Sequence, residues 1–111
     1  MYDQRDVLII PVPFTDLTSE KKRPVLVLSN DAYNACSEDI VVAAITSNLT
    51  EKEYAVLLDD GGMENGVLPK VSMIRADKIY TLSQNIVVKK YGKVNVEIFD
   101  AVREKMEELT A

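Results

Sequence analysis

The sequence predicts a mainly β domain, a barrel or sandwich of short strands followed by one C-terminal helix. Three observations support this prediction: short apolar runs recur through the first two thirds of the chain, turn residues separate them, and a helical period appears only near the end. Because no long helix lies between the runs, a parallel sheet is not expected. The length of 111 residues is that of a single domain, 1–111.

The expected strands follow one another along the chain. The first, 7–10, should stop at Pro11 and Pro13, and the polar stretch 15–22 after it predicts a loop. Strand 25–28 is apolar on both faces, which indicates a central position in the sheet. Further strands are expected at 40–45, 54–58, 71–74 and 78–82, with turns at 59–62 and 65–66.

The C-terminal segment predicts an amphipathic helix, because apolar residues recur there at helical spacing with charged residues between them. Asn95 is the expected N-cap, and Val94 and Phe99 fall at the positions of a hydrophobic staple. We expect the apolar stripe to pack in the core. It consists of Ile98, Phe99, Val102, Met106 and Leu109.

Composition limits the class of protein. The N-terminus carries acids where a secretory signal would carry basic residues, no apolar run reaches the ~20 residues of a membrane helix, and Cys36 has no second cysteine to pair with. These features predict a cytoplasmic protein that makes no membrane contact. The chain also lacks histidine, so we expect no metal site and no cofactor, and catalysis would have to work without the usual general base.

The charge is unevenly distributed. A net charge of −5 is unusual for a protein that binds phosphate groups. However, residues 66–96 carry six basic side chains and one acid, and a second basic group lies at 21–23. An acidic protein can therefore still present a basic surface, although scattered solvated charge would give the same counts.

Arg23 is the first candidate for chemistry. Pro24 stiffens the backbone after it and favours an extended conformation, so the guanidinium should lie at the mouth of the strand that follows. An arginine held in this way can bind a phosphate through two parallel hydrogen bonds and stabilise developing negative charge. The alternative is a surface arginine at the start of a strand.

Polar side chains at the end of strand 40–45 are the second candidate. Thr46, Ser47 and Asn48 offer two hydroxyls and an amide, which can donate hydrogen bonds to phosphate oxygens or to base edges. A simple turn would explain the same three residues.

Two further positions are less specific. Arg75 and Asp77 share one face of an extended strand, which allows either an acid–base couple or an ordinary surface ion pair. Phe14 lies in a stiff, proline-flanked loop, where it could stack on a base or anchor the core.

Taken in order, these segments resemble the MazF/PemK family of toxin ribonucleases, which includes the Kid-like plasmid toxins. The segment 22–29 resembles the Arg-Pro signature of the family, and 44–47 resembles its threonine-containing strand end. The resemblance extends over nearly the whole chain. The other matching segments are 6–17, 68–70, 75–79 and 81–82, together with Ser72 and the closing helix.

The resemblance implies an SH3-like antiparallel β-barrel with a C-terminal α-helix, usually a homodimer. It also implies a sequence-specific, metal-independent endoribonuclease that cleaves single-stranded mRNA, arrests translation and growth, and is neutralised by a cognate antitoxin. By position, the essential arginine and threonine of the family fall on Arg23 and Thr46, and Arg75 and Asp77 match a pair used in the Kid-like branch. The residues expected to contact RNA are Phe14, Thr15, Lys21, Lys22, Ser47, Asn48 and Lys70.

The chain departs from the family pattern at three places. Arg5 stands where most members have glycine, Tyr80 stands where many have arginine, and the first loop lacks the histidine of the Kid-like branch.

The mechanism expected from the resemblance is attack of a ribose 2′-OH on its own 3′-phosphate, which gives a 2′,3′-cyclic phosphate and a 5′-OH and is impossible on DNA. Arg23 would stabilise the transition state, Thr46 would hydrogen-bond a non-bridging oxygen, and Asp77 would act as the base while Arg75 orients the phosphate. The main alternative is a binding module of the same fold that acts on a protein target, as the gyrase-poisoning toxins do. A member that only binds an antitoxin, or a purely structural barrel, would also fit the fold.

Overall fold

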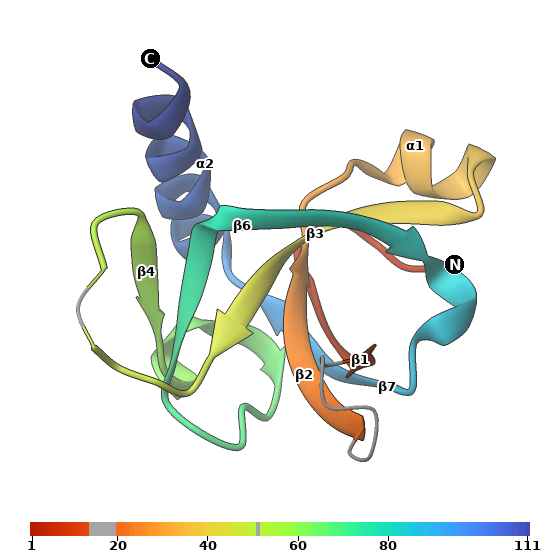
Figure 1. Cartoon of the computed structure of the whole chain (residues 1–111), viewed down its shortest axis with the longest axis horizontal. Helices are drawn as coiled ribbons and strands as arrows, with labels where there is room; N and C mark the ends of the chain where they lie inside the picture. The colour runs from red at the N-terminus through yellow and green to blue at the C-terminus, as the bar shows by residue number, and fades with distance from the viewer. Residues whose placement is uncertain (14–19, 51) are drawn as a thin grey trace.

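The computed structural model describes residues 1–13, 20–50 and 52–111, and Figure 1 shows the arrangement of the elements. All seven strands belong to one sheet, in the order β4-β6-β3-β2-β1-β7-β5, and every pairing is antiparallel. The strands are β1 (Asp6–Pro13), β2 (Glu20–Val27), β3 (Asp39–Thr46), β4 (Ala55–Leu58), β5 (Met63–Gly66), β6 (Ser72–Ser83) and β7 (Lys89–Val94). The helices are α1 (Asp31–Cys36) and α2 (Val96–Thr110), with short 3-10 turns at Asp60–Gly62 and Gln84–Ile86.

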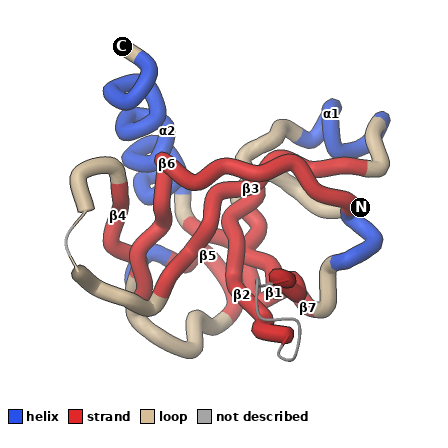
Figure 2. The backbone as a smooth tube through the Cα atoms, in the orientation of Figure 1, coloured by secondary structure: helices blue, strands red, loops and turns tan. Residues whose placement is uncertain are grey.

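The sheet curls into half of a barrel, and α2 packs against β4 and β6 while α1 lies beside β3 (Figures 1 and 2). In the part of the chain that the structure describes, the two outer strands β4 and β5 do not pair, so the barrel stays open between them. The prediction of a mainly β, SH3-like antiparallel barrel with a C-terminal helix is confirmed.

Two apolar clusters occupy opposite faces of the sheet. The inner cluster packs beneath α2 and includes Val7, Leu26, Ala43, Ile45, Leu58, Ile74, Phe99 and Val102. The outer cluster consists of Leu8, Ile10, Val25, Val27, Ile40 and Val42. Consecutive strand residues therefore alternate between the two clusters, which explains why 25–28 is apolar on both faces. The predicted central position is confirmed, because β2 lies between β1 and β3.

Strand β1 is longer than predicted, because it continues through Pro11 to Pro13. It pairs with β2 over its length, but with β7 only as far as Ile9. Pro11 and Pro13 therefore lie in the part of β1 that does not pair with β7. One edge of the strand is free of β7 in this part, so the missing N–H groups of the prolines are tolerated. The predicted loop 15–22 was too long for the same reason, since β2 already begins at Glu20.

The predicted turn at 65–66 is wrong, because both residues belong to β5. Gly66 has φ +80° and pairs with Gly92, whose φ is +157°. The two glycines bring the backbones of β5 and β7 closer than side chains would allow. Asn-Gly is a common turn sequence, so the edge strand β5 was interpreted as a turn. Strand β7 and helix α1 were not predicted at all.

The predicted strands 71–74 and 78–82 are one bent strand, β6. Ala43 pairs with Ile79 whereas the next residue, Ala44, pairs with Arg75, so residues 76–78 are extra on the β6 side. An insertion of this kind is a β-bulge, which bends the strand, and Figure 1 shows the corner in β6.

Helix α2 begins at its predicted cap, and its apolar stripe packs in the inner cluster except for Leu109, which is 41% exposed. Asn95 is the N-cap, and its Oδ1 accepts the backbone N–H of Ile98 at 2.9 Å. Val94 and Phe99 are both buried in the inner cluster, as expected for a hydrophobic staple. The helix thus covers the inner cluster beside β4 and β6, and it does not cover the outer face of the sheet, where the groove described below lies.

Arg5 is the described non-glycine residue with positive φ, at 78°. Its guanidinium donates to the Val94 carbonyl at 2.9 Å and to Glu64 at 3.1 Å. The position is the one where the family usually has glycine, so the side-chain contacts here offset a strained backbone.

We expect Arg5→Gly to be about 1 kcal/mol more stable than Arg5→Ala, because both variants lose the same contacts but only glycine relaxes the left-handed backbone. Urea denaturation of the two variants measures the difference. Equal free energies of unfolding would mean that Arg5 is not strained.

Candidate active site

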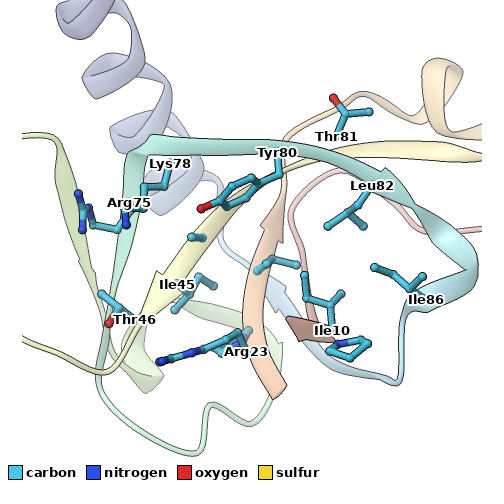
Figure 3. Close-up of a pocket in the computed structure, with 14 residues that line it drawn as sticks. Ile10, Arg23, Ile45, Thr46, Arg75, Lys78, Tyr80, Thr81, Leu82 and Ile86 are labelled. Carbon is cyan, nitrogen blue, oxygen red and sulfur yellow. The ribbon is translucent and has the colours of Figure 1, made fainter. Parts of the chain in front are cut away.

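A groove of about 530 Å³ opens on the sheet face that carries the outer cluster. Arg23 from β2, Thr46 from β3 and Arg75 from β6 line it together, and Figure 3 shows their side chains around one end. Residues that are 23 or more positions apart along the chain thus line the same groove. The predicted shared cleft is present. Thr46 ends β3 as expected, but Arg23 is the fourth residue of β2 and does not lie at the mouth of a strand, because β2 already begins at Glu20.

The alternation of β2 explains where Arg23 lies. Arg23 and Val25 are two residues apart and therefore share a face, and Val25 belongs to the outer cluster below the groove. Lys22 lies on the opposite face. Arg23 is half-buried, and the fixed φ of Pro24 stiffens the strand directly after it.

Thr46 is the last residue of β3. Its Oγ1 accepts the backbone N–H of Asn48 at 3.1 Å. This hydrogen bond orients the hydroxyl while leaving its own proton to donate, so Thr46 can act as a donor to a phosphate oxygen.

Arg75 reaches the groove because of the bulge in β6. With regular pairing, Lys78 would lie opposite Ala44, but the three extra residues place Arg75 there instead. Ala44 lines the groove two residues before Thr46, so the bulge brings the second guanidinium beside the hydroxyl.

Asp77 holds Arg75 in place. The Arg75 Nε donates to Asp77 Oδ1 and Nη2 donates to Oδ2, both at 2.7 Å, so the pair is bidentate. These hydrogen bonds hold the pKa of the Asp77 carboxyl below its usual value and raise the pKa of Arg75. Asp77 does not itself line the groove. A carboxylate with a lowered pKa and both oxygens engaged is a weak proton acceptor, so the geometry favours an orienting role.

We expect Asp77→Asn to lower the free energy of unfolding by about 0.5–1 kcal/mol at pH 7, because the pair is partly exposed. The folded-state pKa is lowered, so this contribution is fully present above the unfolded-state pKa near ~4 and is lost as pH falls through the folded value. Urea titrations of the parent and the variant from pH 7 to pH 3 should therefore converge at the acid end. A difference that stays constant over this range would contradict the assignment, and Glu107→Gln on α2 serves as the exposed-carboxylate control.

A second hollow of about 240 Å³ lies next to the groove, and Arg23, Pro24 and Ile45 line both. Three of the residues predicted to contact RNA line this second hollow: Lys22, Ser47 and Lys70. The two hollows therefore meet at Arg23, with Thr46 and Arg75 in the first hollow and basic and hydroxyl groups in the second.

A family model described as PemK-like, MazF-like toxin of type II toxin-antitoxin system matches residues 3–110. The chain belongs to this toxin family. The resemblance inferred from the sequence is thereby confirmed. No curated protein matches the toxin significantly in sequence.

The toxin is also similar to solved structures of the same fold. An endoribonuclease in complex with its cognate antitoxin, from a mycobacterial species, superposes with a TM-score of 0.82 at 17% identity and covers 99% of this chain and 95% of that one. A MazE–MazF complex from Deinococcus radiodurans has a TM-score of 0.80 at 20% identity, covering 98% and 95%. The Mycobacterium tuberculosis toxin MazF-mt6 has a TM-score of 0.77 at 21% identity, covering 96% of each chain.

Two further residues that were predicted to contact RNA, Lys21 and Asn48, line neither hollow of the toxin. Asn48 lines neither hollow, and its Oδ1 accepts the Thr50 backbone N–H at 3.0 Å and the Thr50 hydroxyl at 2.7 Å. Lys21 is exposed and also lines neither hollow. Phe14 and Thr15 lie outside the described residues.

Sequence reasoning missed part of the toxin's groove wall. Lys78, Tyr80 and Leu82 alternate along β6 on one face, and all three line the groove. The period of two within 78–82 was the available signal, but that period alone does not indicate which face of the strand lines the groove.

Two structural observations concern metals and membranes. Among residues 1–13, 20–50 and 52–111, no three acidic or cysteine side chains are grouped closely enough to hold a metal ion. Over the same residues, neither helix has the length and apolar character required to span a membrane.

Proposed function

We propose that the toxin is a sequence-specific endoribonuclease that cleaves single-stranded mRNA in the cytoplasm without a metal ion and so arrests translation and growth. The observation that supports this proposal is the convergence of Arg23, Thr46 and Arg75, from three strands, on one groove. Two guanidiniums and a hydroxyl donor around one point suit a phosphodiester whose charge increases during the reaction.

The proposed reaction uses the RNA's own nucleophile. The 2′-OH gives its proton to a water molecule as its oxygen attacks the adjacent phosphorus, the bond from phosphorus to the 5′-oxygen breaks, and that oxygen takes up a proton from water. The products are a 2′,3′-cyclic phosphate and a 5′-OH end. Arg23 stabilises the charge that develops on the phosphorane, and the Thr46 hydroxyl donates to a non-bridging oxygen.

Arg75 contributes a second positive charge to the same phosphate. Because Asp77 engages its Nε and one Nη, Arg75 can offer its remaining N–H groups only in the direction that this pair fixes. We therefore assign Asp77 to the orientation of Arg75 rather than to proton abstraction, the role expected from the family resemblance.

The second hollow is the proposed path for the next part of the RNA. Lys22 and Lys70 offer charge to a neighbouring phosphate, and Ser47 offers a hydroxyl. Binding should therefore weaken as salt increases.

The test is incubation of the purified toxin with a long single-stranded transcript in the presence of excess chelator. We expect cleavage at a short recurrent sequence, fragments that end in a 2′,3′-cyclic phosphate, and no cleavage of an oligonucleotide with a single 2′-deoxyribose at the cut site. Cleavage that requires added Mg²⁺, or fragments with 5′-phosphate ends, would contradict the mechanism. No cleavage of RNA at all would favour the alternative of a protein-binding module.

We further propose that the toxin is a homodimer and that a cognate antitoxin covers the groove. Exposed apolar side chains are available for such contacts, among them Leu57, Val67, Val71, Val88 and Val96. Sedimentation at micromolar concentration tests the dimer, and a monomer only would refute it.

A further inference from the structure

Tyr80 is the aromatic residue among the described side chains that line the groove. Half of its surface is exposed. In Figure 3 its ring lies along the groove wall, with the hydroxyl directed toward the end that holds Arg75 and Thr46. An exposed aromatic ring inside a groove is a surface to which a flat ligand group can bind.

The groove is chemically uneven along its length. Arg23, Thr46 and Arg75 gather at one end, whereas Ile10, Leu82 and Ile86 line the other (Figure 3). Ile10 belongs to the outer cluster and Leu82 packs against it, so the apolar end is continuous with the core. The groove therefore suits a ligand with an anionic group next to a flat, mostly apolar one.

The position of Tyr80 is fixed by the sheet. Its register partner on β3 is Val42, which is fully buried in the outer cluster. Tyr80 and Arg75 belong to the same strand, β6, and both line the groove. The ring thus lies beside the residues assigned to the phosphate.

We propose that Tyr80 is the stacking platform for the base of a nucleotide adjacent to the cleaved phosphodiester. This inference rests on the proposed ribonuclease function and extends it by assigning the place of a base. A ring face accepts any base, since all bases have a π surface, and stacking positions the ribose next to the guanidiniums. The phenol hydroxyl is not needed for this role.

The experiment compares Tyr80→Ala and Tyr80→Phe with the parent on a short RNA that contains one mapped cleavage site. We expect Tyr80→Ala to lower kcat/KM about 10- to 100-fold and Tyr80→Phe to stay within about threefold of the parent. Tyr33→Ala is the matched control, because Tyr33 is also an exposed tyrosine but lies on α1, away from the groove. Its activity should equal that of the parent.

The decisive measurement uses the same RNA with a single abasic ribose at each position beside the cut. At one of these positions the parent should slow to the rate of Tyr80→Ala, and Tyr80→Ala should lose nothing more. If the ratio of the cleavage rates of the parent and Tyr80→Ala is the same on intact RNA and on every abasic RNA, the ring does not contact a base. Its loss then affects the rate only through the structure of the groove, and the inference is overturned. A loss in Tyr80→Phe as large as in Tyr80→Ala would overturn it too.

A binding measurement separates this inference from the proposed function. A 2-aminopurine is placed at the same position in an RNA whose cut site carries a 2′-O-methyl group, and its fluorescence should be quenched by the parent and by Tyr80→Phe but not by Tyr80→Ala. If no RNA is cleaved, 2-aminopurine is placed at each position of the RNA in turn, and quenching at any of them by the parent but not by Tyr80→Ala would refute the ribonuclease and support the stacking site. Cleavage of ordinary RNA at the parental rate by Tyr80→Ala would refute the stacking site and leave the ribonuclease standing.

Discussion

Replacing Arg23 with alanine is expected to lower the single-turnover rate of RNA cleavage about 10²- to 10³-fold while the fold stays intact. The reason is the position of the guanidinium at the meeting point of the two hollows, where it shares the groove with Thr46 and Arg75. Removal of one aligned donor leaves the charge of the transition state less stabilised, whereas substrate in the ground state loses less. The rate constant should therefore fall more than the affinity.

Two further variants make this result specific. Arg23→Lys keeps the charge but loses the planar fork of donors, so it should recover only a small part of the rate. Arg103→Ala, which changes the net charge equally at an exposed site on α2, should cleave as the parent does. If Arg103→Ala is as slow as Arg23→Ala, the effect is one of overall charge and the assignment of Arg23 is wrong. Equal free energies of unfolding in urea, within about 1 kcal/mol, exclude a folding defect.

The elements that the sequence predicted well are those whose pattern is local. Helix α2 has its cap, staple and most of its apolar stripe within one continuous segment, and β3 is an apolar run bounded by polar residues. Thr46 ends β3 as predicted, whereas Arg23 is the fourth residue of β2, because β2 continues along β1 back to Glu20.

The elements that could not be predicted depend on partners far away in sequence. The bulge in β6 is visible only when β3 is aligned against it, and without the bulge Arg75 could not be placed opposite Ala44. Strand β7 is half lysine and half apolar or glycine, and it is a strand because β1 and β5 pair with its two edges. Proline within β1 and glycine within β5 indicate breaks by local rules, and neighbouring strands override those rules.

The largest effect on stability is expected for Gly66→Ala, at about 2–5 kcal/mol of unfolding free energy. A Cβ at this position would lie 2.0 Å from the Tyr91 carbonyl oxygen and 2.6 Å from the Gly92 Cα, and φ is +80°. The left-handed backbone costs about 1–2 kcal/mol for a residue with a Cβ, and forcing apart closely packed backbone adds about 1–3 kcal/mol. The chain cannot simply swing away here, because Leu68 is buried in the inner cluster two residues later.

Gly61→Ala is the matched control for this substitution. Its added Cβ would meet the Asp59 side chain at 3.1 Å, so the expected change is within about 1 kcal/mol. In thermal denaturation, the Tm of Gly66→Ala should therefore lie about 10 °C or more below that of the parent, and the Tm of Gly61→Ala should be close to that of the parent. Because the crossing of β5 and β7 leads directly into the segment with Lys70, which lines the second hollow, Gly66→Ala should also weaken RNA binding. If Gly66→Ala has the same Tm as Gly61→Ala, the backbones of β5 and β7 are not closely packed at Gly66 and Gly92, and the prediction is wrong.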